Sequence, residues 1–177
     1  MKLTNTKEAL NKFSDYVIQQ SRTRLTKKKQ NYTRELYESL RYDLEESDDG
    51  YIIDFYMTDY GQFQDKGVRG TKSTYGQSSQ SPFSYKSSSN LKGLEYKTKI
   101  FSKWAEFRRM QPRDKKGRFG SYKTMGYILA NSIKKKGIKA TMFFTKSFEM
   151  GFEKLPQELT TAFILDIEYQ IMLLQKK

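Results

Sequence analysis

Basic residues that stand near aromatic residues are the side chains with the clearest chemical potential in this sequence. A cation beside a flat ring suits contact with a phosphate or stacking on a base. No helix-turn-helix, zinc-finger or RNA-recognition signature accompanies them, so any contact with DNA is expected to be with its backbone, without sequence preference. The residues that we expect to face DNA or another partner are Lys66, Arg69, Lys72, Arg113, Lys115, Lys116 and Arg118.

The segment from Gly67 to Ser73 is similar in composition to a phosphate-binding loop, but its spacing differs. That motif has four residues between its two glycines and a lysine directly after the second. Here two residues separate Gly67 from Gly70, and Thr71 precedes Lys72. We therefore interpret the segment as a glycine-rich basic loop without a nucleotide site.

The amino-acid composition excludes several classes of enzyme. The 177 residues include no histidine and no cysteine. A Ser-His-Asp triad, thiol catalysis, disulfides and cysteine-type zinc sites are therefore impossible. The aspartates from Asp48 to Asp65 do not follow a calcium-loop pattern, and positions in turns and at strand edges explain them better than a metal site. We expect no catalytic residue, metal or cofactor, and hence a protein that is not an enzyme.

Neither end of the chain has the pattern of a membrane segment. The N-terminus, MKLTNTKEALNKF, lacks the apolar core of a signal peptide. The stretch from Phe163 to Leu174 is the most apolar, but Asp166, Glu168 and Gln170 interrupt it. It is also too short to span a bilayer. We expect no membrane partner and synthesis in a reducing compartment.

The net charge of +13 is concentrated in the middle of the chain. Residues 61–145 carry 19 Lys/Arg and 4 Asp/Glu, a net charge of +15, whereas residues 1–60 and 146–177 each carry −1. This asymmetry indicates a polyanion or an acidic protein surface as a neighbour. A solvated basic face that keeps the protein in solution is the simpler alternative.

The two ends of the chain are predicted to pack around a small sheet. The spacing of Leu10, Phe13 and Val17 predicts a helix over residues 4–20, capped by Thr4 or Thr6. Alternating polar and apolar residues around a turn at residues 47–50 predict a β-hairpin over residues 39–58. A helical turn over residues 59–67 follows the hairpin.

The C-terminal part is predicted to contain a strand and two helices. Residues 138–144 read as a strand, and a short helix follows it. Pro156 suits the first turn of the last helix. The wide apolar stripe of that helix, from Leu159 to Leu174, predicts either core or half core and half subunit interface.

The middle of the chain is predicted to be an arm followed by a helical insertion. Residues 71–90 contain eight serines and no regular period, so we expect an extended serine-rich arm or loop over residues 71–98. Tyr75, Phe83 and Tyr85 would anchor this arm on another surface. Residues 99–137 are predicted to be the helical insertion, with helices over 99–110 and 122–136.

Together these elements predict a single α+β domain over residues 1–177. Its small antiparallel sheet is packed by the N- and C-terminal helices, and the middle of the chain is a loop and helical insertion.

One segment and its surroundings resemble a known family. The segment is DYGQFQDKG, residues 59–67, with the hairpin before it and FFTKSF, residues 143–148, after it. This pattern resembles the tail-completion, or neck, proteins of tailed bacteriophages, which connect head and tail. The similarity is greatest to members from crAss-like phages, in which segments like DKGVRGTKS and PRDKKGRF also occur. The family's Glu-Gly-Thr triplet is replaced here by Asp65-Lys66-Gly67-Val68, and the insertion over residues 71–137 is longer than usual.

The resemblance implies a structural virion protein, namely a subunit of an oligomeric ring that joins the portal of the head to the tail. It implies a ring of twelve copies rather than six. The expected partners are further copies of the chain, the portal, other neck or tail ring proteins, and packaged DNA in the lumen. The expected location is the neck and tail region of the virion, after assembly in the host cytoplasm.

Two other functions compete with this interpretation. A sequence-nonspecific DNA-binding protein would use the same basic residues and would bind free duplex as a monomer. A small nuclease would need clustered acidic residues in the basic region, but residues 61–145 offer only Asp65, Glu95, Glu106 and Asp114. We rank the nuclease last for that reason.

Overall fold

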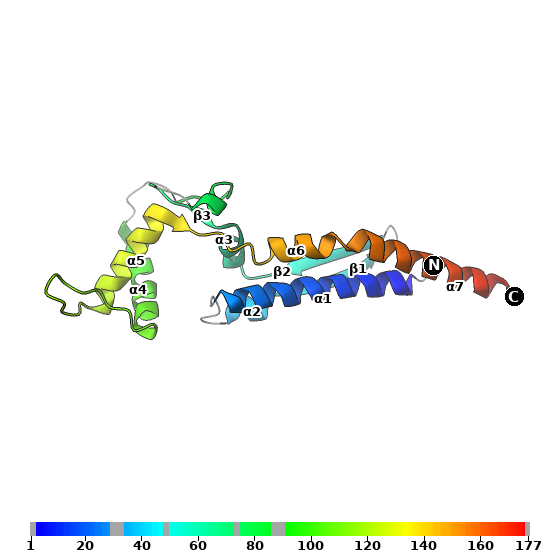
Figure 1. Cartoon of the computed structure of the whole chain (residues 1–177), viewed down its shortest axis with the longest axis horizontal. Helices are drawn as coiled ribbons and strands as arrows, with labels where there is room; N and C mark the ends of the chain where they lie inside the picture. Colours follow the sequence, from blue (N-terminus) through cyan, green and yellow to red (C-terminus); the bar gives the residue numbers. More distant parts are fainter. Residues whose placement is uncertain (1–2, 29–33, 48–49, 73–74, 86–90, 176–177) are drawn as a thin grey trace. The chain divides into compact units, whose positions relative to one another are not determined.

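A computed structural model describes residues 3–28, 34–47, 50–72, 75–85 and 91–175 (Figure 1). These residues form an α+β fold with seven α-helices and two separate two-stranded antiparallel sheets, which confirms the predicted fold class. The chain divides into two compact units. The terminal unit comprises Met1–Asp65 and Met142–Lys177, and the inserted unit comprises Lys66–Thr141. The segment predicted as an insertion in a single domain therefore forms a compact unit of its own.

In the terminal unit, helices cover one face of the predicted hairpin. The unit contains α1 (Thr4–Lys27), α2 (Glu35–Ser39), β1 (Arg41–Ser47), β2 (Gly50–Tyr56), α6 (Thr145–Phe152) and α7 (Leu155–Gln175). Helix α1 runs beside α6 and α7, with the hairpin against them (Figure 1). The register pairs Tyr42 with Phe55 and Leu44 with Ile53, and these side chains pack toward the helices. The predicted hairpin is confirmed, while residues 48–49 of its turn lie outside the described residues.

Aromatic side chains fill the space between hairpin and helices. The ring of Phe55 on β2 lies 6.3 Å from that of Phe13 on α1, 5.5 Å from that of Phe144 and 6.0 Å from that of Phe148. All three contacts are edge-to-face, the arrangement that aromatic pairs prefer. Phe143 is fully buried in the neighbouring cluster, which α1 and α2 share. The core of the terminal unit therefore depends on residues from both ends of the chain.

The start of α1 is capped by a carboxylate that comes from α7. One oxygen of Asp166 accepts hydrogen bonds from the backbone and side-chain N–H groups of Asn5, both at 2.9 Å. The other oxygen accepts from the Thr6 backbone N–H at 2.9 Å and the Thr6 hydroxyl at 2.8 Å. The prediction that Thr4 or Thr6 caps this helix is wrong: Leu3 holds the cap position, without a side-chain cap. The external carboxylate satisfies the free N–H groups of the first turn instead.

The environment of Asp166 favours its ionised form. The side chain is only 3% exposed. Burial by itself would raise the pKa of the carboxyl group, but the hydrogen bonds from Asn5 and Thr6 outweigh burial and hold the pKa of Asp166 below its usual value. Such a group stabilises the fold above the ordinary pKa of an aspartate, and that stability is lost as the pH falls through the lowered pKa.

The segment that carries the family resemblance is built around a second capping carboxylate. Asp65 is the penultimate residue of α3 (Tyr60–Lys66), the predicted helical turn, and is 3% exposed. Its carboxylate accepts hydrogen bonds from the Phe144 N–H at 2.8 Å and from the Thr145 N–H and hydroxyl, at the start of α6. A Cβ on Gly61 would lie 2.8 Å from the side chains of Leu36 on α2 and Met57 after β2, so a larger residue there would require these side chains to shift. These residues of the segment therefore have structural roles.

The inserted unit consists of a helix pair and a short sheet. Helices α4 (Leu91–Phe107) and α5 (Tyr122–Lys136) pack closely where Gly126 faces α4. A Cβ on Gly126 would lie only 2.6 Å from the carbonyl oxygen of Thr98, so the absence of a side chain allows this approach. Strand β3 (Val68–Arg69) pairs with β4 (Gly137–Ile138), and the 3₁₀-helix η1 (Gly76–Ser78) lies beside them. The predicted helix over residues 122–136 is confirmed.

Two boundaries in this part of the chain differ from prediction. Helix α4 begins at Leu91, so residues 91–98 are helical and do not belong to an extended arm. The predicted strand over residues 138–144 is wrong, because β4 ends at Ile138. Beyond it, the Ala140 N–H donates to the Ser78 hydroxyl at 2.9 Å, and Met142 turns the chain with a φ of 51°. Hydrogen bonds to Ser78 of η1 and Asp65 of α3 replace the ladder that a longer strand would need.

The Asp166 cap generates a pH-dependent stability prediction. We expect Asp166→Asn to lower the free energy of unfolding by about 2 kcal/mol at pH 7, because an amide cannot accept from all four donors. The deficit should begin to shrink as the pH falls below about 4, the ordinary pKa of an aspartate, because protons then bind preferentially to the unfolded wild type. It should disappear as the pH falls through the lowered pKa of Asp166 in the folded protein. Urea unfolding followed by circular dichroism at pH 7 and pH 3 measures both effects.

The matched control is Glu168→Gln, an exposed position on the same helix, which should leave stability unchanged at both pH values. Equal stability of Asp166→Asn and the wild type at pH 7 would contradict the capping role.

Candidate functional site

The basic residues are concentrated in the inserted unit. Residues 66–141 carry 19 Lys/Arg against 3 Asp/Glu, a net charge of +16, whereas the terminal unit carries 14 against 17, a net charge of −3. The limits of the charge excess therefore coincide with those of a folded unit. Because such a unit attracts polyanions, its exposed cations form the candidate functional surface.

The loop between α4 and α5 folds into a basic turn, residues 113–119, which we call the basic tip. Arg113 and Phe119 pair as an isolated antiparallel bridge. The Asp114 carboxylate accepts hydrogen bonds from the backbone N–H groups of Lys116 at 2.8 Å and Arg118 at 2.9 Å, and from the Arg118 guanidinium at 2.9 Å. The backbone hydrogen bond from Arg118 is the largest cause of a lowered pKa for Asp114. The only acidic residue of the tip is thus used to hold the turn.

The basic tip presents cations together with an aromatic ring. The Arg113 guanidinium lies 4.3 Å from the centre of the Phe119 ring, and Phe119 is 64% exposed. Lys115 and Lys116 are also exposed. A turn that is fixed by its own hydrogen bonds loses little conformational freedom when it binds a partner. This arrangement suits contacts with phosphates, with stacking on Arg113 or Phe119.

The structure separates the seven predicted basic residues into two groups. Arg113, Lys115, Lys116 and Arg118 belong to the basic tip, whereas Lys66, Arg69 and Lys72 lie at or beside β3. Helix α5 connects the tip to β4, the partner strand of β3, and its 15 residues span about 22 Å. The predicted residues therefore do not form one continuous patch.

The group near β3 includes lysines that the sequence prediction left out. The backbone N–H groups of Thr71 and Lys72 donate to the carbonyl oxygens of Lys134 and Lys135, both at 3.0 Å, so the loop lies against the end of α5. Lys134, Lys135 and Lys136 form the last turn of that helix. Lysines are favourable charges at a helix C-terminus in any case, so their position in the sequence gives no sign that Lys72 lies beside them.

The predicted anchors of the arm belong to a segment that packs on its own unit. The Arg69 N–H donates to the Phe83 carbonyl at 2.9 Å, and the Tyr85 N–H donates to the Arg69 carbonyl at 3.0 Å. Tyr75 is 42% exposed. Residues 75–85 are therefore not extended away from the fold, while residues 73–74 and 86–90 of the predicted arm lie outside the described residues.

Two serines of this segment make buried hydrogen bonds to backbone carbonyl groups. The Ser78 hydroxyl donates to the Ile138 carbonyl at 2.9 Å, and the Ser81 hydroxyl donates to the Gly67 carbonyl at 2.7 Å. Both serines are nearly or fully buried. The eight serines of residues 71–90 suggested low complexity, and nothing in their spacing marked these two as structural.

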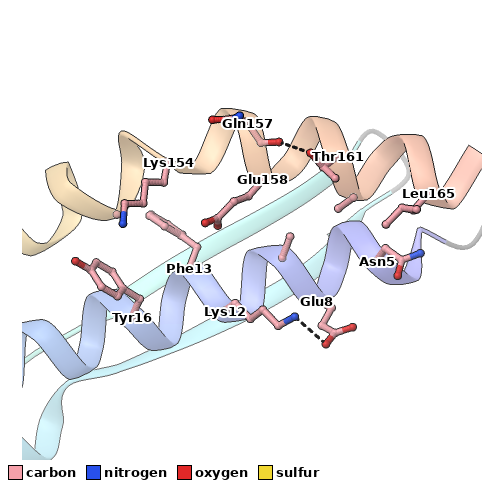
Figure 2. Close-up of a pocket in the computed structure, with 13 residues that line it drawn as sticks. Asn5, Glu8, Lys12, Phe13, Tyr16, Lys154, Gln157, Glu158, Thr161 and Leu165 are labelled. Carbon is pink, nitrogen blue, oxygen red and sulfur yellow. Dashed lines mark hydrogen bonds and ion pairs between the residues drawn. The ribbon is translucent and has the colours of Figure 1, made fainter.

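The terminal unit contains a groove that the sequence did not reveal. It lies between α1 and the α6–α7 segment, with a volume of about 880 Å³ (Figure 2). Phe13, Ala162 and Leu165 give it apolar surface, and its rims carry two acidic and two basic side chains. One pair on the rim is the ion pair between Lys12 and Glu8, at 3.2 Å. The spacing of apolar residues predicts the buried face of each helix, but it does not predict a groove between two helices.

The described residues contain neither a cluster of carboxylates nor a membrane-spanning helix. Within the described residues, no group of three or more Asp or Glu side chains comes together in the manner of a metal site. None of the helices, as far as the structure describes them, is long and apolar enough to cross a membrane.

The basic tip generates a prediction about binding to polyanions. We expect the double variant Lys115→Glu, Lys116→Glu to bind duplex DNA more weakly than the wild type at low salt. The slope of log K against log salt should become shallower by about two, because two phosphate contacts are lost. Fluorescence anisotropy over a salt series measures the slope.

The same charge change in the terminal unit provides the control. Lys7→Glu together with Lys12→Glu should leave the salt slope unchanged, because both lysines lie outside the inserted unit. If both double variants change the slope equally, the basic tip has no special part in the interaction.

Comparisons with known proteins add no relative from which a function could be carried over. The chain matches no protein-family model, no curated protein sequence and no solved structure.

Proposed function

We propose that this chain is a structural protein of a tailed-phage virion, a subunit of the neck or connector ring that joins the portal to the tail around the DNA channel. The proposal begins from the resemblance of residues 59–67 and their surroundings to tail-completion proteins. The observation that carries it is the separation of charge between the two units, +16 on the inserted unit and −3 on the terminal unit.

This separation of charge suits a subunit with two kinds of neighbour. A ring around packaged DNA needs a cationic lining that contacts phosphates without reading sequence. The inserted unit has that charge, and its basic tip exposes cations on a fixed turn. The terminal unit is close to neutral, so it can lie against protein neighbours, such as other copies, the portal and other neck or tail rings, without strong repulsion.

The apolar surface of α7 supports assembly into a larger particle. Eight large apolar side chains of this helix are between 44% and 74% exposed: Phe163, Ile164, Leu165, Tyr169, Ile171, Met172, Leu173 and Leu174. A helix that is apolar on most of its surface is normally buried in a larger structure, and a patch of this size on a soluble subunit marks an interaction site. The sequence allowed either core or half core and half subunit interface for this stripe, and the exposure favours the second alternative.

A ring subunit of this kind needs no catalytic residue, metal or cofactor. Its work is to bind neighbours in a fixed geometry, and its location is the virion neck after assembly in the host cytoplasm. Identical subunits that meet through two different surfaces form a closed ring when the rotation between them closes.

A sequence-nonspecific DNA-binding protein is the second candidate. The basic tip favours it, because Arg113, Phe119 and the neighbouring lysines would act in the same way on free duplex. This candidate gives no role to the exposed surface of α7, and for that reason we rank it second.

The mass of the full-length protein, alone and with portal-containing complexes from a phage lysate, tests the proposal. A ring of twelve copies of the 20.9 kDa chain has a mass of about 251 kDa, since 12 × 20.9 = 250.8. We expect either this discrete mass or a smaller species that joins the portal complexes. A monomer that ignores those complexes, but binds duplex DNA with a steep salt dependence, would replace the proposal with the second candidate.

A further inference from the structure

Helix α7 extends beyond the N-terminal end of α1, the helix against which it packs. Asp166 accepts hydrogen bonds from Asn5 and Thr6 in the first turn of α1. The N-terminal end of α1 therefore lies beside the middle of α7. Residues 167–175 continue beyond that point (Figure 1). These nine residues form a helix end of about 14 Å at 1.5 Å per residue. We call this segment the free helix end.

The free helix end is apolar on several sides. Tyr169, Ile171, Met172, Leu173 and Leu174 are 60%, 49%, 58%, 44% and 74% exposed, respectively. At these exposures the five side chains present roughly 500 Å² of apolar surface to water. Glu168 is the single charged residue among residues 167–175. A surface of this composition suits burial against a protein neighbour.

The groove of the terminal unit matches the free helix end in length and character. Its lining along α1 runs from Asn5 to Tyr16, twelve residues that span about 17 Å. Phe13 lies between the two helices, and Leu165 lies beside the start of α1 (Figure 2). The four charged side chains on the rims sum to zero, so the groove does not repel a nearly uncharged helix.

A chain cannot place its free helix end in its own groove. One wall of the groove is α7 itself, from Gln157 to Leu165, and the free helix end is the direct continuation of that helix. The groove wall and the free helix end are thus successive parts of one helix, and they cannot meet within one copy. A second copy can bring its free helix end into the groove of the first.

We infer that residues 167–175 of one copy occupy the groove between α1 and α7 of the next copy. The contact is heterologous, because each copy uses its helix end on one side and its groove on the other. Contacts of this type generate rings or open chains. The inference rests on the proposed function, and it names the surface through which the ring subunits join.

The expected interface is small, which determines how it should be tested. Roughly 500 Å² from the helix end and a similar area from the groove give about 1,000 Å² in total, the lower limit for a specific interface. We therefore expect the contact to depend on protein concentration. A covalent trap under a concentration series suits such an interface better than a single measurement of mass.

The absence of native cysteine makes cross-linking selective. Leu174→Cys places a thiol on the free helix end, and Thr161→Cys places one on the exposed rim of the groove. On mild oxidation, we expect the double variant to form a ladder of covalent multimers. We expect a mixture of the two single variants to form a 161–174 cross-linked dimer, identified by mass spectrometry. Circular dichroism of each variant establishes that it is folded.

The matched control moves the second thiol to another exposed site of the same unit. Asp54→Cys on β2, combined with Leu174→Cys, should give no ladder. Efficient dimers of Leu174→Cys alone would overturn the inference, because they would indicate that two helix ends pair with each other. The inference also fails if the folded double variant forms no ladder at any concentration.

The mass of the uncrosslinked protein separates this failure from that of the proposed function. A ring mass, or capture by portal complexes, without 161–174 cross-links would place the subunit contact elsewhere and leave the ring proposal standing. A monomer that neither cross-links nor joins portal complexes would remove both.

Discussion

The hydrogen bonds between Asp166 and the first turn of α1 fix the geometry on which the rest of the terminal unit depends. They join residues about 160 positions apart in sequence and set the register of the two longest helices. That register decides how much of α7 extends beyond α1 and which residues of the two helices border the groove. A carboxylate that is ionised, buried and shared by four donors tolerates little displacement, so a shift of α7 by one turn would leave all of these groups unpaired.

Asp65 performs the same task where the chain leaves and re-enters the terminal unit. It caps α6, and its carbonyl oxygen accepts a hydrogen bond from the Met142 N–H at 3.0 Å, so the two segments that lead to the inserted unit are joined at this point. The inserted unit is held by close backbone approach instead. At Gly137, with a φ of 83°, a Cβ would lie 2.7 Å from the Gly70 backbone nitrogen. Each unit therefore positions its own exposed surface, apolar on α7 and basic at the tip.

Much of this architecture was predictable because it depends on local periodicity. The hairpin, the helix over residues 122–136 and the apolar stripe of the last helix follow from the period of their side chains. The two carboxylate caps were not predictable, since nothing near Thr4 or Thr145 in sequence indicates an acceptor from far along the chain. The strand predicted over residues 138–144 failed for a related reason. Its apolar residues suit a strand, but its hydrogen bonds go to Asp65 and Ser78.

The candidate site was predicted in composition but not in arrangement. Net charge identified the basic region, and the turn chemistry of Asp114 and Gly117 agrees with the observed tip. Neither could show that Lys72 lies beside the end of α5, or that the predicted cations form two groups. The groove is a property of two helices together, so no single window of sequence contains it. Sequence patterns therefore do not predict features that depend on residues brought together by the fold.

Hydrogen exchange of this chain inside purified phage particles, compared with the free protein, tests the account most directly. If the chain is a neck subunit, it is present in the particles, and residues 167–175 and 113–119 exchange more slowly there than in solution. Absence of the chain from purified particles, or equal exchange of both segments in the two states, would contradict the account.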